Sequence, residues 1–259
     1  LFAVLFSLLC FFYVFGGVSR AETLDWATRP ATNLLTNTDS ATVNGVTVQT
    51  SAATTGSFNP TPPTVSILPG TSANGSGAGI LGSQIDATTD NEAAGATFTF
   101  NFSEPVYNLT IVVRDIDGGP SCTCNFNDIV SFNSSAGLPT SFTAGSAVAY
   151  NSATGRASAN TNAGLGDASG NMTVTFAGPV TSATVTHIAA AINSSNNPAF
   201  QVILVDDLTF QRAPRLAVRK TSTGGVGTFT YDITNGPAGT INTSVTTVTA
   251  GTAVTGTQF

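Results

Sequence analysis

The sequence predicts an all-β protein, and three observations lead to that class. Charged residues make up only 8% of the 259 residues, whereas hydrophobic residues make up 41%, so long charged helices and coiled coils are excluded. Apolar and polar residues alternate with a period of two in many short segments. Turns rich in Gly, Asn, Ser and Pro separate these segments. We therefore expect a jelly-roll-like antiparallel β-sandwich over residues 22–210.

Individual segments support this expectation in chain order. Asn44-Gly45 lies between β-branched residues and predicts a two-residue hairpin turn. Phe98, Phe100 and Phe102 share one face of a strand, and the same alternation occurs in 109–113, 130–132 and 172–176. Longer strands are expected over 180–192 and 200–210, and long loops over 51–77, 117–127 and 151–170.

The N-terminus has the pattern of a secretory signal peptide. Residues 1–15 form an almost unbroken apolar run, which is shorter than the roughly 20 residues of a transmembrane helix. Ser19 and Ala21 supply the small residues that a signal peptidase reads. We expect residues 1–21 to be removed and mass spectrometry to find Glu22 at the mature N-terminus. The product would be secreted or held at the cell surface, with no membrane insertion after cleavage.

A second β domain is expected after residue 210. Residues 211–215 interrupt the alternation and read as a linker, and residues 216–259 read as the start of a further β domain that is cut short. The stretch LAVRKTSTGGVGTFTYDITNG (216–236) resembles the opening hairpin of the prealbumin-like (transthyretin-like, SpaA-type) repeats of bacterial surface and adhesin proteins. The stretch FSEPVYNLTIVVRDIDGG (102–119) and the strands after it resemble the N-terminal β-sandwich module often placed before such repeats. The resemblance implies an exported, modular bacterial surface protein and implies no particular ligand.

Charge and motifs narrow the class of function. Eight Lys and Arg against 14 Asp and Glu argue against a nucleic-acid partner, which needs a basic surface. His187 is the only histidine, and no G-x-S-x-G motif of a serine hydrolase occurs. Glu92 and Glu104 are the only internal glutamates, and nothing in the sequence places them across a cleft as a glycosidase requires.

These points predict a non-enzymatic module for adhesion, display or scaffolding at the bacterial envelope, with a glycan or a protein as its surface ligand. The alternative is a carbohydrate-binding module, which should have an aromatic strip on one sheet face or a grooved apex. Trp26 is the only tryptophan, so Tyr107 or Tyr150 would have to contribute to such a strip. A hydrolase fragment, the third class, would need a polar cleft with paired carboxylates.

Several aspartates are candidates for a structural calcium site. Asp115 and Asp117 continue the parity of a core-facing strand, Asp128 shares the parity of Val130, and either Asp206 or Asp207 should face inward. Carboxylate oxygens clustered at strand ends suit Ca²⁺. We therefore predict a calcium site formed by Asp115, Asp117, Asp128 and Asp207. The alternatives are turn-capping aspartates or ion pairs with Arg114 or Arg156.

Two further sites concern covalent bonds. Cys10 would leave with the signal peptide, so Cys122 and Cys124 remain, as a strained loop disulfide or as an idle pair. Lys220 is the only lysine. The prealbumin-like resemblance implies an intramolecular isopeptide bond from Lys220 to a last-strand Asn, and the alternative is a solvated lysine. Asp232 would be the assisting acid, although its parity opposite Tyr231 counts against that role.

Overall fold

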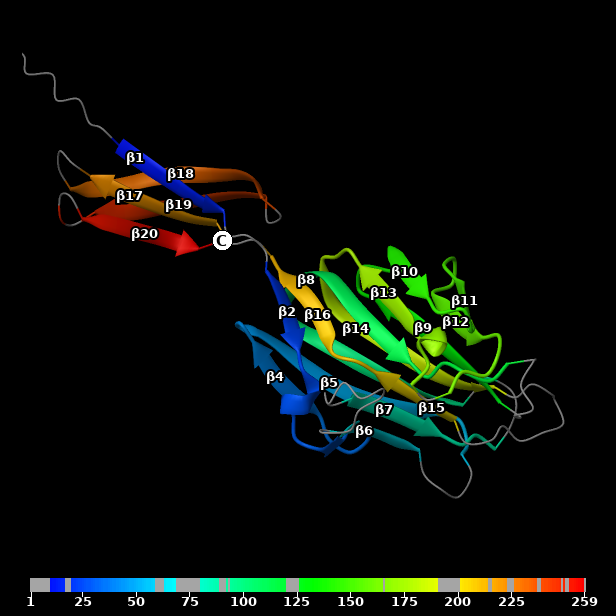
Figure 1. The fold of residues 1–259 in the computed structure, drawn as a ribbon. Helices are drawn as coiled ribbons and strands as arrows, with labels where there is room; N and C mark the ends of the chain where they lie inside the picture. The colour runs from blue at the N-terminus through cyan, green and yellow to red at the C-terminus, as the bar shows by residue number, and fades with distance from the viewer. Residues whose placement is uncertain are drawn as a thin grey trace, which may run out of the picture. The chain divides into compact units, whose positions relative to one another are not determined.

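In the residues that it describes, the computed structural model consists of strands and two short 3-10 turns (Figure 1). It describes residues 10–16, 20–58, 63–68, 80–88, 92, 94–119, 126–164, 166–190, 201–213, 216–222, 226–236, 239–247, 249 and 252–258. The chain divides into two compact units, Arg20–Arg212 and Leu1–Ser19 with Ala213–Phe259. Within the described ranges, no helix has the length and apolar character to cross a membrane. The chain is all-β, as the sequence predicts.

In the described residues, the larger unit contains fifteen strands, all paired antiparallel. They are β2 (Ala21–Leu24), β3 (Thr32–Asn33), β4 (Asp39–Val43), β5 (Val46–Thr55), β6 (Thr64–Leu68), β7 (Ile80–Ile85), β8 (Gly95–Arg114), β9 (Asn127–Ser134), β10 (Ser141–Ala144), β11 (Val148–Asn151), β12 (Arg156–Ala159), β13 (Met172–Phe176), β14 (Val180–Ala190), β15 (Gln201–Val205) and β16 (Leu208–Arg212). The turns η1 (Trp26–Thr28) and η2 (Ala168–Gly170) begin after Asp25 and Asp167, whose side chains accept hydrogen bonds from backbone N–H groups.

The long strand β8 connects the two layers of this unit. Its first half pairs with β5 and β14, giving a layer in the order β4-β5-β8-β14-β9-β12-β11. Its second half pairs with β13 on one side and with β16 and β15 on the other, and β10, β2 and β7-β6-β3 extend that layer. One strand therefore contributes to both layers of a β-sandwich.

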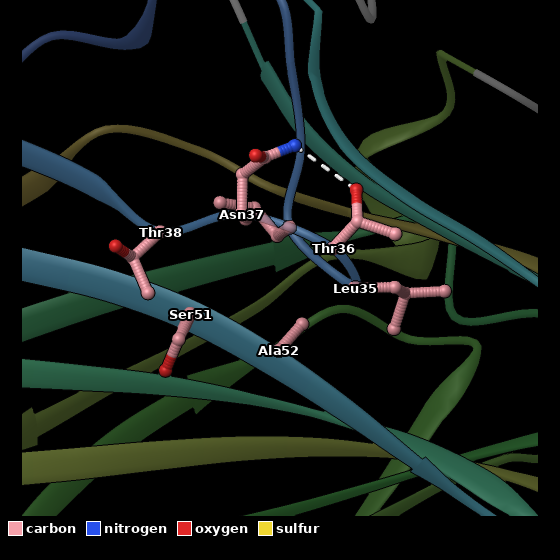
Figure 2. A pocket seen from close by; sticks show the side chains of 7 residues that line it. Leu35, Thr36, Asn37, Thr38, Ser51 and Ala52 are labelled. Carbon is pink, nitrogen blue, oxygen red and sulfur yellow. Dashed lines mark hydrogen bonds between the residues drawn. The ribbon is translucent and has the colours of Figure 1, made fainter.

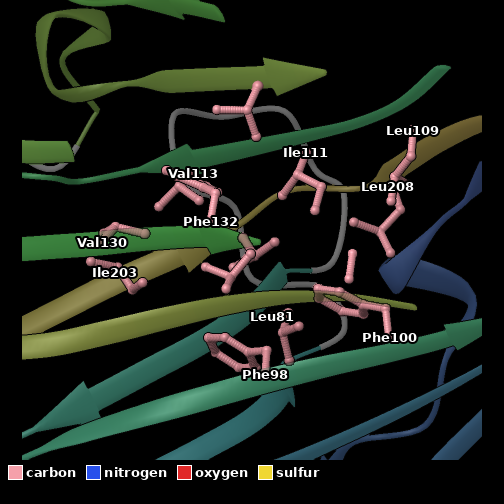
Figure 3. Close-up of a cluster of buried hydrophobic side chains, with 14 of the residues drawn as sticks. Leu81, Phe98, Phe100, Leu109, Ile111, Val113, Val130, Phe132, Ile203 and Leu208 are labelled. Carbon is pink, nitrogen blue, oxygen red and sulfur yellow. The ribbon is translucent and has the colours of Figure 1, made fainter. Parts of the chain in front are cut away.

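The core lies between these layers. Phe98 and Phe100 come from the first half of β8, Ile111 and Val113 from the second half, and all four are 0% exposed (Figure 3). Burying each such side chain contributes about 1.5–3 kcal/mol to folding. The predicted inward faces of 98–102, 109–113, 130–132 and 172–176 are confirmed.

The predicted hairpin is also confirmed, because Val43 pairs with Val46 and both Asn44 (φ 46°) and Gly45 (φ 88°) take positive φ. Two predicted loops are wrong. The range 51–77 contains the end of β5 and all of β6, and the range 151–170 contains β12. The end of β5 and β12 hold mostly small Ser, Thr and Ala residues, whose weak polarity contrast resembles that of a loop, whereas β6 (TVSIL) is a short alternating strand inside a range rich in Pro, Gly and Ser. The predicted strand 200–210 is two strands, β15 and β16, separated by Asp206 and Asp207.

The smaller unit contains β1 (Cys10–Gly16), β17 (Leu216–Ser222), β18 (Gly227–Gly236), β19 (Gly239–Thr247) and β20 (Ala253–Gln258). Its pairs are β1-β17, β17-β20 and β18-β19. Strand β1 lies inside the predicted signal peptide, and the cleavage after Ala21 stays a prediction. The prealbumin-like assignment of 216–259 also stays a prediction.

Two predicted covalent sites are not decided by the described residues. Lys220 lies in β17 with Phe12 and Val254 as its backbone partners, and Asp232 lies opposite Asn242, so the isopeptide bond stays a prediction. Cys122 and Cys124 lie outside the described residues.

Candidate functional site

Three buried polar side chains form a line across the core of the larger unit. Ser83 lies on β7 between the inward-facing Leu81 and Ile85, His187 lies on β14, and Asp128 lies on β9. All three are 0% exposed. Because side chains alternate along a strand, each occupies a core position of its strand. We call Ser83, His187 and Asp128 the buried polar line.

Every contact in this line is a hydrogen bond. His187 Nδ1 lies 3.1 Å from Ser83 Oγ, and His187 Nε2 lies 3.2 Å from Asp128 Oδ1. The backbone N–H of Asp117 donates to Asp128 Oδ2 at 3.1 Å. The line therefore links β7 of one layer to β14 and β9 of the other.

Burial sets the protonation states of the line. It raises the pKa of Asp128 well above its usual value and lowers the pKa of His187 to about 3. Burial therefore favours the uncharged form of both side chains. The hydrogen bonds of the line join the two layers of the sandwich.

The combination of Ser, His and Asp is that of a hydrolase triad, but its placement differs. A catalytic serine must reach a substrate, whereas Ser83 is fully buried. A general base works best with a pKa near the working pH, and the pKa of His187 is about 3. The arrangement therefore suits structure better than acyl transfer. Sequence reasoning missed the partnership because the three residues lie on separate strands and form no motif.

Two of the predicted calcium ligands lie beside this line. Asp115 follows the end of β8 with φ 65°, which breaks the strand alternation, and it is half-buried. Burial, followed by the charge of Asp117, raises the pKa of Asp115 to about 6. Burial, followed by the charge of Asp128, raises the pKa of Asp117 to about 7. Asp115, Asp117 and Asp128 are thus electrostatic neighbours.

Asp207, the fourth predicted ligand, has other partners. Its Oδ1 accepts a hydrogen bond from the Trp26 backbone N–H at 2.9 Å, and burial raises its pKa. Asp206 and Asp207 lie between β15 and β16 and are both partly buried, so the expectation that one of them faces inward stays a prediction. Asp206 forms an ion pair with Arg114. No three His, Cys, Asp or Glu side chains in the described part of the chain are arranged to hold a metal ion together, and calcium binding stays a prediction.

The outer face of the β4-β5-β8-β14-β9 layer is polar and uncharged. Thr97 lies opposite Thr186 and Thr99 opposite Thr184, and the hydroxyls of Thr97 and Thr186 are 3.0 Å apart. Apart from Ala53, Ile129 and Ile188, the side chains with this outward parity carry hydroxyl or amide groups: Ser40, Thr42, Thr47, Gln49, Ser51, Thr97, Thr99, Asn101, Ser131, Asn133, Ser182, Thr184 and Thr186. We call these residues the outer face.

A second surface feature lies where the two layers meet at β10 and β11. Phe142 of β10 is 49% exposed, and its ring centroid lies 4.5 Å from that of Tyr150 on β11. Leu138, in the turn after β9, is 37% exposed. The Tyr150 hydroxyl is buried without a hydrogen-bond partner, and burial raises its pKa. We call Leu138, Phe142 and Tyr150 the edge patch.

Tyr150 was a sequence candidate for sugar contact, whereas Phe142 was missed because one aromatic residue in a short polar strand carries no pattern. Tyr107, the other candidate, is half-buried on β8 opposite Gln211, away from β10 and β11 in the strand order.

A cavity of about 530 Å³ opens between β5 and the turn after β3 (Figure 2). It is lined by Leu34, Leu35, Thr36, Asn37, Thr38, Ser51 and Ala52. Asn37 Nδ2 donates to Thr36 Oγ1 at 2.9 Å, so part of its polar lining is already paired. These lining residues include no carboxylate, whereas glycoside hydrolysis uses two.

No family model matches the sequence, and no curated protein matches it. Among solved structures, the chain is similar to a family 11 carbohydrate-binding module from Clostridium thermocellum in complex with a β-1,3-1,4-mixed-linked tetrasaccharide. The match covers 75% of this chain and 96% of that chain, with 10% sequence identity and a TM-score of 0.28.

Proposed function

We propose that this chain is a non-enzymatic extracellular module that presents an adhesive surface at the cell envelope. The observation that carries the proposal is the outer face, an uncharged array of hydroxyl and amide groups on five neighbouring strands. Such groups donate and accept hydrogen bonds without attracting charged partners. In a chain of net charge −6, this face favours a neutral, hydrogen-bonding ligand surface.

The buried polar line supports the non-enzymatic part of the proposal. Its three side chains already satisfy one another, and none is exposed to a substrate. Buried polar networks whose members are all hydrogen-bonded make a core rigid and help to specify its packing.

The test uses the full chain coupled to fluorescent beads and films of neutral polysaccharide, anionic polysaccharide and protein. We expect the beads to adhere to a neutral film. Replacing both Thr99 and Thr184 with Lys should abolish adhesion because it desolvates two charges at the contact. The matched control, Thr173→Lys on β13, places a charge on the other layer and should leave adhesion unchanged.

Equal adhesion of the Thr99→Lys, Thr184→Lys variant would contradict the outer face as the adhesive surface. Turnover of a polysaccharide or ester substrate by the wild-type chain would contradict a non-enzymatic module.

Carbohydrate binding is a second candidate function, and the edge patch is the observation that favours it. A half-exposed aromatic ring at a sandwich edge can stack on a sugar ring, as the sequence alternative of a carbohydrate-binding module requires.

A further inference from the structure

The edge patch consists of two aromatic residues in contact and an exposed leucine in the preceding turn. Phe142 and Tyr150 lie on β10 and β11, and their rings are in contact at 4.5 Å. Leu138 approaches the turn before β12, since a Cβ placed on Gly155 would lie 2.7 Å from Leu138 Cδ2. Leu138 and Phe142 are among the few exposed large hydrophobic side chains of the described residues. The Phe142–Tyr150 contact is therefore an exposed aromatic feature that the fold assembles from two strands.

The exposed sequence neighbours of the patch are polar. Thr140, Ser141 and Thr143 lie near Phe142 in the chain, and Asn151 follows Tyr150. Asn151 pairs with Arg156, whose charge is already matched by the ion pair with Glu92. A pyranose ring has an apolar C–H face with hydroxyls at its rim, so it matches an exposed aromatic ring with polar groups nearby.

The Tyr150 hydroxyl adds an independent indication of a ligand. It is buried without a partner, and an unpaired buried hydroxyl costs about 1–3 kcal/mol. Phe142 lies against the Tyr150 ring and is half exposed, so the Tyr150 ring lies beside a side chain that borders solvent. A ligand hydroxyl that entered there would pair the phenol and remove this cost.

We propose that Phe142 and Tyr150 form a stacking subsite for one sugar ring of a neutral polysaccharide, with the Tyr150 hydroxyl as its hydrogen-bond partner. This inference rests on the proposed binding function and adds a second contact, distinct from the outer face.

The experiment is affinity electrophoresis of the full chain in gels that contain a soluble neutral β-glucan, galactomannan, xylan or α-glucan. We expect retardation by at least one polysaccharide. Phe142→Ala should weaken that binding about tenfold, and Tyr150→Phe should weaken it by several-fold while the ring remains. Leu68→Ala on β6, which removes another exposed hydrophobic side chain, is the control and should bind as wild type does.

The outcomes separate this subsite from the proposed function. Retardation of wild type and Phe142→Ala alike would overturn the subsite and leave polysaccharide binding standing. Failure of wild type to be retarded in every gel would overturn this inference, while the bead assay would still decide adhesion through the outer face. Self-association that Phe142→Ala abolishes, seen by light scattering without retardation, would assign the patch to a second copy and overturn the inference.

Discussion

The buried polar line and the edge patch are opposites in the same sandwich. In the line, polar side chains occupy core positions, and each of the three has a hydrogen-bond partner. In the patch, aromatic side chains occupy the surface, and the one buried polar atom, the Tyr150 hydroxyl, has no partner. A buried polar group that has its hydrogen-bond partner stabilises the fold. An exposed aromatic ring beside an unpaired hydroxyl can still contact and hydrogen-bond a ligand. This difference is what we expect if, as proposed, the module acts through its edge and outer face.

The largest effect is expected from breaking the buried polar line. His187→Ala removes a fully buried ring and leaves Ser83 and Asp128 without their partner. We expect a loss of about 3 kcal/mol or more in the free energy of unfolding, measured by urea denaturation. The control is Thr186→Ala, because Thr186 is adjacent to His187 in the chain but lies on the outer face. It should change the free energy of unfolding by less than about 1 kcal/mol. Similar losses for the two variants would mean that the line has no special structural role.

Calcium binding would change the comparison, because the Asp128 end of the buried polar line would then also be a ligand site. If Asp115, Asp117 and Asp128 hold Ca²⁺, the free energy of unfolding should rise by about 2.7 kcal/mol at 100 times the Kd. Melting temperatures in millimolar calcium and in EDTA at pH 8 measure this effect. An identical melting temperature in both would refute the calcium prediction.

A smaller effect is expected from the pH dependence of stability. The pKa of Asp117 is raised to about 7 in the folded state, so its stabilising contribution is full below its unfolded value of about 3.8 and is lost as pH rises through 7. The substitution Asp117→Asn removes the titrating carboxyl, and with it the loss of stability as pH rises. Relative to wild type in EDTA, the variant should gain about 1 kcal/mol between pH 4 and pH 8, after allowance for partial exposure.

The matched control for this pH effect is Asp167→Asn. The Ser169 backbone N–H lowers the pKa of Asp167, so its contribution is present at higher pH and lost as pH falls. Relative to wild type, the Asp167→Asn variant should therefore lose stability as pH rises, which is the opposite of the change expected for Asp117→Asn. A difference between Asp117→Asn and wild type that does not vary with pH would contradict the raised pKa of Asp117.

Local patterns in the sequence predicted much of this fold. Phe98 and Phe100 face inward because alternate side chains share a face of a strand, and Asn44-Gly45 turns because both residues tolerate positive φ. The same parity placed His187 with Val185, and both are buried. These inferences need only neighbouring residues, so a single sequence is enough for them.

The candidate sites depend on contacts that a single sequence does not contain. Ser83 meets His187 although 104 residues separate them, because β7 and β14 lie in opposite layers. Phe142 meets Tyr150 because the chain crosses from one layer to the other between β10 and β11. Asp115 leaves the predicted parity because its positive φ ends the strand. Long-range pairing and local backbone reversals are set by the whole fold.

The most direct test of the account measures stability and binding together in Ser83→Ala and Phe142→Ala. For Ser83→Ala we predict a lower melting temperature, since His187 Nδ1 loses its buried partner, and unchanged retardation by the neutral polysaccharide that binds wild type. For Phe142→Ala we predict an almost unchanged melting temperature and binding about tenfold weaker. The reverse pattern, in which Ser83→Ala abolishes binding or a catalytic activity at unchanged stability while Phe142→Ala binds normally, would contradict the account.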